Sequence, residues 1–261
     1  MIVTVCQLRV DQAGGPVANW PALVAHVHAH HSDLVLLPEM PFYPWPFGRR
    51  RFDPTIWEAS ETAHDSWLAR LGELAPAVVA GSRPVTRSGE RYNEGFLWSA
   101  TGGYTPTHDK HYLPDEDGFW EGSWYRRGDG QFEAVPLHPD ESVPAAGFLI
   151  CTELWFLERA RAYGRAGAEL LLVPRASEHR TIDKWLAAGR VAAMVAGSFA
   201  LSSNHYGDTD EPFALGGQGW VIDPEGEVLA LTGPARPFVS IDIDLERAAA
   251  ARSTYPRYVQ E

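Results

Sequence analysis

Short apolar runs alternate with helical segments along nearly the whole chain, and this alternation limits the fold more than any other feature. Residues 34–37 form such a run, ended by Pro38, and residues 170–173 form another, as expected of buried strands. Segments 20–27 and 182–196 instead carry apolar residues at helical spacing. No linker or low-complexity segment interrupts the pattern. We therefore predict one α/β domain over residues 1–261, with layered sheets and outer helices.

The composition excludes several classes of protein. A formal net charge of −12 would repel a polyanion over most of the surface, so no nucleic-acid partner is expected. No apolar run approaches the roughly 20 residues that span a bilayer, and residues 1–10 are typical of a first strand rather than a signal peptide. The two cysteines are too few for a disulfide framework, and no Cys-x-x-Cys pair indicates zinc. A cytoplasmic location is the default expectation.

Three polar residues follow predicted strands, where reactive groups of α/β proteins gather. Glu39 follows the run 34–37, Lys110 follows the second strand of a predicted hairpin, and Cys151 ends the apolar run that precedes it. Taken singly, each has an ordinary explanation: a helix cap or ion pair, a surface charge, and a cysteine of the core. Cys6, in the first strand, is interpreted as a core residue.

Together, these three residues form a chemical set. A cysteine attacks as its thiolate, and an ordinary pKa of about 8.5 leaves only a few per cent ionised at neutral pH. A helix N-terminus after Cys151 and the charge of Lys110 would lower that pKa. Glu39 can take the thiol proton and pass it to a leaving amine, while Lys110 and the backbone N–H of Thr152 stabilise an oxyanion. This chemistry needs no metal and no cofactor.

At these positions the sequence resembles the nitrilase superfamily of carbon–nitrogen hydrolases. "LVLLPEMPF" resembles the family segment that bears a catalytic glutamate, "DKHYLPDEDGFWEGSWYRRGDG" the lysine segment, and "GFLICTELWF" the cysteine segment. These segments match the family's catalytic residues to Glu39, Lys110 and Cys151, and "YNEGFLW" and "GGQGWVIDPEGEVLA" support the register. The resemblance covers nearly the whole chain. It implies a four-layer α–β–β–α sandwich, a thioester acyl-enzyme, and protomers that pair as a homodimer or larger homo-oligomer.

The same resemblance implies a second glutamate in the loop after the lysine. The loop offers Glu116 and Glu121, and Glu121 is preferred because "GFWEGSWY" resembles the context found in the family's carbamoyl hydrolases. It would keep Lys110 charged or position the substrate amine. The sequence also departs from the family pattern, because many members have Asp and Pro where this chain has Glu153 and Leu157.

Aromatic residues are expected around the site. The chain has 10 tryptophans, and we choose Tyr43 and Trp155 as residues that line the Cys151 pocket, which would favour a flat or apolar acyl group. Arg175 is a candidate for binding a substrate carboxylate. His26 and His30 lie four apart in a helical segment without a carboxylate or cysteine cluster beside them, so no metal site is predicted.

The leading functional prediction is a hydrolase that cleaves an amide or N-carbamoyl C–N bond through a Cys151 thioester and releases ammonia or an amine. Its substrate would be a small amide, a ureido compound or a nitrile. A nitrilase is the first alternative, and an acyltransferase that uses the same thioester is another. From a different class, the chain could be a catalytically silent, oligomeric binding protein, although its four intact polar positions speak against this.

Overall fold

The described residues form twelve strands, all connected to one another by hydrogen-bonded pairing. The computed structural model describes residues 1–9, 17–138, 144–207 and 214–259. The strand order is β5-β4-β3-β2-β1-β9-β8-β7-β6, with β12 beside β1 and the β10–β11 hairpin beside β9. The strands are β1 (Ile2–Leu8), β2 (Leu34–Leu36), β3 (Val78–Arg87), β4 (Glu90–Ser99), β5 (Gly103–Asp109), β6 (Val135–Pro136), β7 (Ala145–Phe148), β8 (Leu170–Arg175), β9 (Phe199–His205), β10 (Trp220–Ile222), β11 (Val228–Leu231) and β12 (Phe238–Asp242).

Strand β1 joins two sheets. Its residues Val3–Val5 pair in parallel with β2, whereas Gln7 and Leu8 pair in parallel with β9. The two sheets face each other across an apolar core, in which Leu34 of the first sheet and Leu172 of the second belong to one cluster. The two sheet layers of the sandwich therefore share this buried core.

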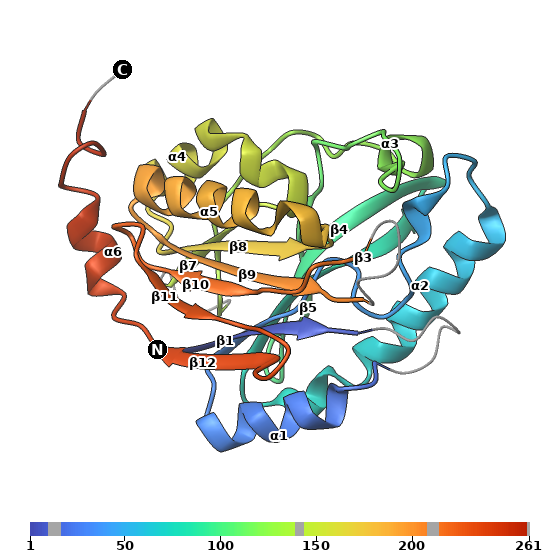
Figure 1. The fold of residues 1–261 in the computed structure, drawn as a ribbon, viewed down its shortest axis with the longest axis horizontal. Helices are drawn as coiled ribbons and strands as arrows, with labels where there is room; N and C mark the ends of the chain where they lie inside the picture. Colours follow the sequence, from blue (N-terminus) through green and yellow to red (C-terminus); the bar gives the residue numbers. More distant parts are fainter. Residues whose placement is uncertain (10–16, 139–143, 208–213, 260–261) are drawn as a thin grey trace.

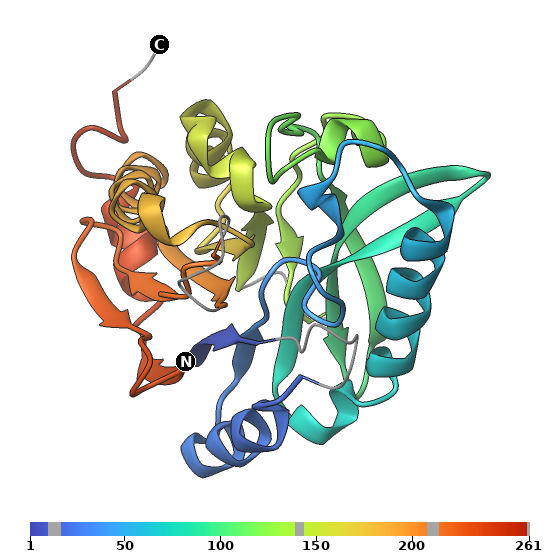
Figure 2. The ribbon, with the colours of Figure 1, turned by 45° about the vertical axis from the view of Figure 1, so that its right-hand side comes forward.

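Helices cover the outer face of each sheet (Figures 1 and 2). Trp20 and Leu23 of α1 are buried with Val35 and Val79 of the first sheet, and Ala192 of α5 is buried in the cluster of the second sheet. The result is the four-layer α–β–β–α sandwich, which confirms the predicted fold class. The helices are α1 (Trp20–His30), α2 (Pro54–Leu68), α3 (Glu121–Trp124), α4 (Leu157–Arg165), α5 (Ile182–Ala196) and α6 (Glu246–Ala251), with 3₁₀ turns η1 (Pro46–Gly48), η2 (Leu71–Leu74), η3 (Cys151–Trp155) and η4 (His179–Thr181).

The helix expected after Cys151 is divided into two parts. The pattern predicts one helix from 153 to 167, but the chain forms the 3₁₀ turn η3 first and α4 begins only at Leu157. The break lies at Phe156, whose ψ of 75° is not helical. The same kind of change occurs between α2 and η2. The sequence pattern predicts one helix over roughly 56–74, but α-helical geometry ends at Leu68.

Helix α4 is fixed closely on β7, the strand that leads to Cys151. The ring of Tyr163 lies directly over Gly147, where a Cβ atom would be 2.4 Å from the ring, so only glycine allows this approach. The Tyr163 hydroxyl donates a hydrogen bond to the carbonyl oxygen of Phe148 over 3.0 Å. Sheet and helix therefore hold the chain on both sides of η3.

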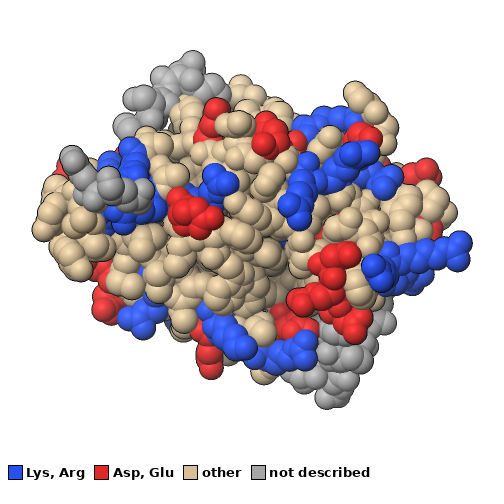
Figure 3. Space-filling model, turned by 90° about the horizontal axis from the view of Figure 1, so that it is seen from above, with Lys and Arg blue, Asp and Glu red and all other residues tan. Residues whose placement is uncertain are grey.

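Charged side chains of both signs lie on the surface. On the face seen in Figure 3, basic and acidic side chains are interleaved and separated by wide uncharged areas. In the part of the chain that the structure describes, no helix is both long and apolar enough to cross a lipid bilayer.

Candidate active site

Strand ends bring the three predicted residues to one edge of the sandwich. Glu39 comes shortly after β2, Lys110 directly after β5, and Cys151 three residues after β7. Backbone hydrogen bonds fix two of these exits: the N–H of Glu39 donates to the carbonyl oxygen of Arg175 over 3.2 Å, and that of Lys110 to Asn93 over 2.8 Å. The third exit is a sharp turn, because Cys151 has a left-handed φ of 49°.

Lys110 lies between two buried glutamates. Its Nζ is 2.7 Å from Oε1 of Glu39 and 2.6 Å from Oε2 of Glu121, and all three side chains are 0% exposed. Glu121 is held there by α3, the short helix inside the loop that the sequence pattern leaves irregular. Of the two glutamates offered by that loop, Glu121 contacts the lysine and Glu116 does not.

Two neighbours that sequence reasoning missed orient these carboxylates. Asn93 of β4 donates from Nδ2 to Oε1 of Glu39 over 2.8 Å, and the hydroxyl of Tyr125 donates to Oε2 of Glu121. The segment "YNEGFLW", used above only for register, contains Asn93 and was the available signal for it. Both side chains are buried, so their hydrogen bonds fix which carboxylate oxygen faces the lysine.

Each glutamate keeps one oxygen for another partner. Oε2 of Glu39 and Oε1 of Glu121 are buried and have no hydrogen-bond partner among the described residues. Buried carboxylate oxygens are normally satisfied, so a pair of unsatisfied ones beside a lysine indicates a functional site. One can accept a proton, and the other can accept an N–H group from a ligand.

Burial and mutual charge shift the pKa values of this cluster. Burial alone would lower the pKa of Lys110, but the carboxylates of Glu121 and Glu39 outweigh it and raise that pKa above its ordinary value. Burial raises the pKa of Glu121 to about 7, opposed by Lys110 and assisted by Glu39. Lys110 therefore keeps its positive charge at neutral pH.

The thiol pKa differs from the expectation. Burial raises the pKa of Cys151, the charge of Glu39 raises it further, and the opposing effect of Lys110 is too small to compensate. The predicted lowering by the lysine and the helix is wrong in its net result. Because the resting group is a thiol, it needs a base at the moment of attack, and the unsatisfied oxygen of Glu39 is suited to that task.

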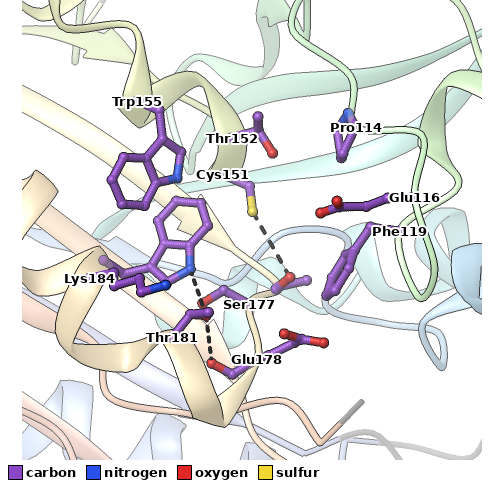
Figure 4. Close-up of a pocket in the computed structure, with 12 residues that line it drawn as sticks. Pro114, Glu116, Phe119, Cys151, Thr152, Trp155, Ser177, Glu178, Thr181 and Lys184 are labelled. Carbon is purple, nitrogen blue, oxygen red and sulfur yellow. Dashed lines mark hydrogen bonds between the residues drawn. The ribbon is translucent and has the colours of Figure 1, made fainter. Parts of the chain in front are cut away.

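Cys151 forms part of the wall of a pocket with a cavity volume of about 200 Å³ (Figure 4). Its sulfur lies 3.9 Å from the carbonyl oxygen of Ala176, and the residue is 3% exposed. The other lining residues are Pro114, Glu116, Phe119, Thr152, Trp155, Ala176, Ser177, Glu178, Thr181, Lys184 and Trp185. Phe119, Trp155 and Trp185 give this pocket aromatic walls, as the sequence predicts.

The structure separates the four predicted binding residues into two pairs. Thr152 and Trp155 line the pocket, and the centroid of the Trp155 ring lies 5.2 Å from that of Trp185, with the two rings tilted by 59°. Tyr43 does not line this pocket. Arg175 does not line it either. It is 1% exposed, and its guanidinium donates hydrogen bonds to Ser202, Ser177 and the carbonyl oxygen of Gln218.

Arg175 is therefore not positioned to bind a substrate carboxylate, which corrects the prediction. Burial lowers its pKa to about 10, yet it stays charged at neutral pH between the rings of Trp185 and Trp220. Its position at the end of β8 was predicted correctly, but the orientation of its side chain follows from partners on other segments: Ser202 of β9, Ser177 and Gln218. Glu178 and Lys184, which do line the pocket, were missed because they lie beyond that strand, Glu178 directly before η4 and Lys184 in α5.

The cluster can therefore carry out nucleophilic catalysis. A thiol in the pocket, a buried carboxylate with a vacant acceptor oxygen and a buried cation are the groups that acyl transfer needs. Within the described ranges, no group of three or more His, Cys, Asp or Glu side chains has a geometry that could hold a metal ion. Both cysteines are free thiols.

Comparison with known proteins agrees with this geometry. The sequence model of the carbon–nitrogen hydrolase family matches residues 2–253. The omega-amidase of Xenopus tropicalis is 27% identical over 238 residues, covering 86% of this chain and 81% of its own. The 2-oxoglutaramate amidase of Bacillus subtilis is 28% identical over 233 residues, covering 87% and 83%.

Solved structures share the fold. A carbon–nitrogen hydrolase from Helicobacter pylori superposes with a TM-score of 0.85 at 22% identity, covering 98% of this chain and 94% of that chain. An amidase from Nesterenkonia sp., with acrylamide added to its active-site cysteine, superposes with a TM-score of 0.75 at 19% identity, covering 97% of each chain. Because the family match extends over almost the entire sequence, the chain belongs to the carbon–nitrogen hydrolase family.

Proposed function

We propose that the protein is a thiol amidase that hydrolyses the primary amide of a small organic acid and releases ammonia. The observation that carries this proposal is the buried Glu39–Lys110–Glu121 array, with one unsatisfied oxygen on each glutamate, beneath the pocket of Cys151. A binding protein would gain nothing from burying a cation between two carboxylates next to a thiol, since such an arrangement is costly to desolvate.

The proposed reaction has two halves. Glu39 accepts the proton of the Cys151 thiol as sulfur attacks the amide carbon, while Lys110 and the backbone N–H of Thr152 stabilise the oxyanion. Protonated Glu39 then gives its proton to the leaving nitrogen, and ammonia departs from a thioester. In the second half, Glu39 removes a proton from water, which attacks the thioester. The acid leaves, and the proton returns to sulfur.

An amide suits this site better than a nitrile. The unsatisfied Oε1 of Glu121 can accept a hydrogen bond from an N–H of the substrate. A primary amide offers two such hydrogens, and a nitrile offers none. An N-carbamoyl group also carries a terminal amide, so it remains a candidate substrate within the same mechanism.

The pocket suggests an acyl group with a charged end. Lys184 is the only cation among the described residues that line it, and Figure 4 shows it across the cavity from Glu116. The carboxylate of Glu178, also in the lining, is already paired with Arg180 at 2.5 Å. Two relatives are named as an omega-amidase and a 2-oxoglutaramate amidase, and 2-oxoglutaramate is the monoamide of a dicarboxylic acid. We therefore place such monoamides of dicarboxylic acids first among the substrates.

Ammonia release from a mixed set of substrates tests the function. The set contains monoamides of short dicarboxylic acids, neutral amides of equal length, ureido acids and nitriles. We expect ammonia from the amides and labelling of Cys151 by an acyl group, seen as a mass increase after rapid acid quenching. Ammonia from nitriles alone would establish a nitrilase instead, and silence with an inert Cys151 would contradict the enzyme proposal altogether.

Replacing Lys184 with methionine tests the substrate class. We expect the KM for a carboxylate-bearing amide to rise about 10-fold, or about 1.4 kcal/mol, because one partly exposed charge contact is lost. The kcat/KM for a neutral amide of equal length should stay unchanged, and Lys184→Arg should keep the preference. Equal losses on both amides would mean that Lys184 does not recognise the carboxylate.

Three further points stay predictions. The domain is predicted to extend over residues 1–261, and the protein is predicted to act in the cytoplasm. Two copies are predicted to pair through the helices that flank Cys151. In support of pairing, Val191 of α5 is 37% exposed on the outer layer, where a second copy would cover it.

A further inference from the structure

We propose that Glu153 is a positioning residue that holds the backbone on both sides of the site in register. It does not line the pocket, and its carboxylate contacts neither Lys110 nor Cys151. It instead binds the residue that follows the lysine and the residue that precedes the cysteine. This inference rests on the proposed amidase mechanism for its kinetic test, but not for its chemical test.

One carboxylate joins two segments that are far apart in the sequence. Oε1 of Glu153 accepts the backbone N–H of His111 over 2.7 Å, and Oε2 accepts the backbone N–H of Ile150 over 2.8 Å. The side chain is 0% exposed, so water does not compete for these bonds. The end of β5 and the start of η3 are therefore fixed to each other through a single rigid group.

The charge of Glu153 is balanced inside the protein. His108, two residues before Lys110, places Nε2 at 2.9 Å from the carboxylate and Nδ1 at 3.2 Å from the carbonyl oxygen of Gln131. Both ring nitrogens face acceptors, an arrangement that a doubly protonated imidazolium satisfies beside an ionised Glu153. Burial alone would lower the pKa of His108, but the charge of Glu153 outweighs it and raises that pKa.

The cysteine turn needs such support. Cys151 adopts a left-handed φ of 49°, a conformation that costs a residue with a side chain about 1 kcal/mol or more. Glu153 bonds the N–H of the residue immediately before this turn, as the acidic residue of a capping box does. If that bond is lost, the turn can relax and move the sulfur relative to Lys110 and the proposed base, Glu39.

Two variants separate the backbone hydrogen bonds from the ion pair. Glu153→Gln removes the charge and can satisfy only one of the two N–H groups, because its amide nitrogen cannot accept. His108→Gln removes the imidazolium but leaves the Glu153 carboxylate on both N–H groups. Each variant is assayed for kcat and KM per active Cys151, counted by thiol titration. The rate of Cys151 alkylation by iodoacetamide is measured in parallel.

We expect Glu153→Gln to lower kcat per titrated site by about 10- to 100-fold, the usual effect of misplacing reactive groups by about 1 Å. KM should change less than about twofold, since Glu153 does not touch the pocket. His108→Gln should lose less than about threefold. Glu153→Asp keeps the charge with a shorter reach, so its kcat should lie between those of the wild type and Glu153→Gln.

Other outcomes also decide the proposal. Equal losses of kcat in Glu153→Gln and His108→Gln would overturn it in favour of a simple ion pair. An unchanged kcat per titrated site in Glu153→Gln would also overturn it. If Glu153→Gln does not fold, the comparison of Glu153→Asp with His108→Gln is judged by the same criterion. If the wild type hydrolyses no amide, the proposed function fails by itself, and the alkylation rate decides. Slower labelling in Glu153→Gln alone would support positioning, and equal rates would overturn it.

Discussion

Replacing Cys151 with alanine is expected to abolish amide hydrolysis, with kcat reduced by about 10⁴-fold or more. The proposed mechanism passes through a thioester, and alanine offers no atom that can form one. The hydroxyls of Thr152, Thr181 and Ser177 also line the pocket, but they do not replace the thiol. Oγ of Ser177 accepts hydrogen bonds from Arg175 and Asn204, and neither of these partners is a base that could take its proton.

The measurement is steady-state ammonia release, together with the mass of the protein after quenching. Cys6→Ala is the matched control because Cys6 is the other cysteine of the sequence. Cys6 is 0% exposed, and its thiol donates a hydrogen bond to the carbonyl oxygen of Leu36. Burial raises its pKa to about 12. Wild-type activity in Cys6→Ala and none in Cys151→Ala is the expected pair. Retained activity in Cys151→Ala, with circular dichroism unchanged, would contradict the thioester.

Replacing Lys110 with methionine is expected to lower the free energy of unfolding at pH 8 by about 3–5 kcal/mol, the cost of breaking a buried charge pair. Glu39 and Glu121 would stay buried without the cation that lies 2.7 Å and 2.6 Å from them. Activity should vanish as well, because the oxyanion loses its cation. This is the largest stability effect that we expect from a single substitution at the site.

The sign of the pH dependence follows from Glu121. Its pKa is raised from an ordinary value of 4.5 to about 7 in the folded protein. Between those values the folded state keeps a proton that the unfolded state has lost, so stability falls as pH rises through this window. Without Lys110 the carboxylates lose the charge that opposes the rise. Lys110→Met should therefore recover stability on acidification from pH 8 towards pH 5, and more steeply than the wild type.

Urea unfolding at pH 8 and pH 5.5 measures this effect. Lys184→Met is the matched control, since Lys184 is the only other lysine of the sequence and is exposed. It should change stability by less than about 0.5 kcal/mol. The triple change Glu39→Gln, Lys110→Met, Glu121→Gln removes all three charges and should restore most of the stability without the activity. Equal stability of Lys110→Met and the wild type at pH 8 would show that the glutamates are not ionised.

The two predictions and the Glu153 proposal concern one structural unit. Lys110 is fixed through its side chain by two carboxylates, and the residue after it is fixed through its backbone by Glu153. The Glu39–Lys110–Glu121 array determines the charges beside Cys151, and in our proposal Glu153 determines the distances between Cys151, Lys110 and Glu39. Loss of the first should appear as stability and activity together, whereas loss of the second should appear mainly as kcat.

The sequence by itself determined the strands, most helices and the order in which the reactive residues occur. These features are local, because a strand or helix shows itself in the spacing of apolar residues within its own short segment. Glu39, Lys110 and Cys151 could therefore be placed at strand ends. The resemblance to a known family then predicted the four-layer sandwich. The pairing of β1 with β2 of one sheet and with β9 of the other confirms it. Even the choice of Glu121 over Glu116 came from that resemblance.

Only the tertiary structure decided what each side chain contacts. Arg175 looked like an anion-binding residue at a strand end, but partners on other segments bury its guanidinium. The local sequence suggested a lowered pKa for the Cys151 thiol, but burial raises it. Glu153 looked like a departure from a family pattern, yet it joins β5 to η3 across 42 residues of sequence. Desolvation and contacts between distant segments depend on how sheets and helices stack, and no local pattern of residues records that arrangement.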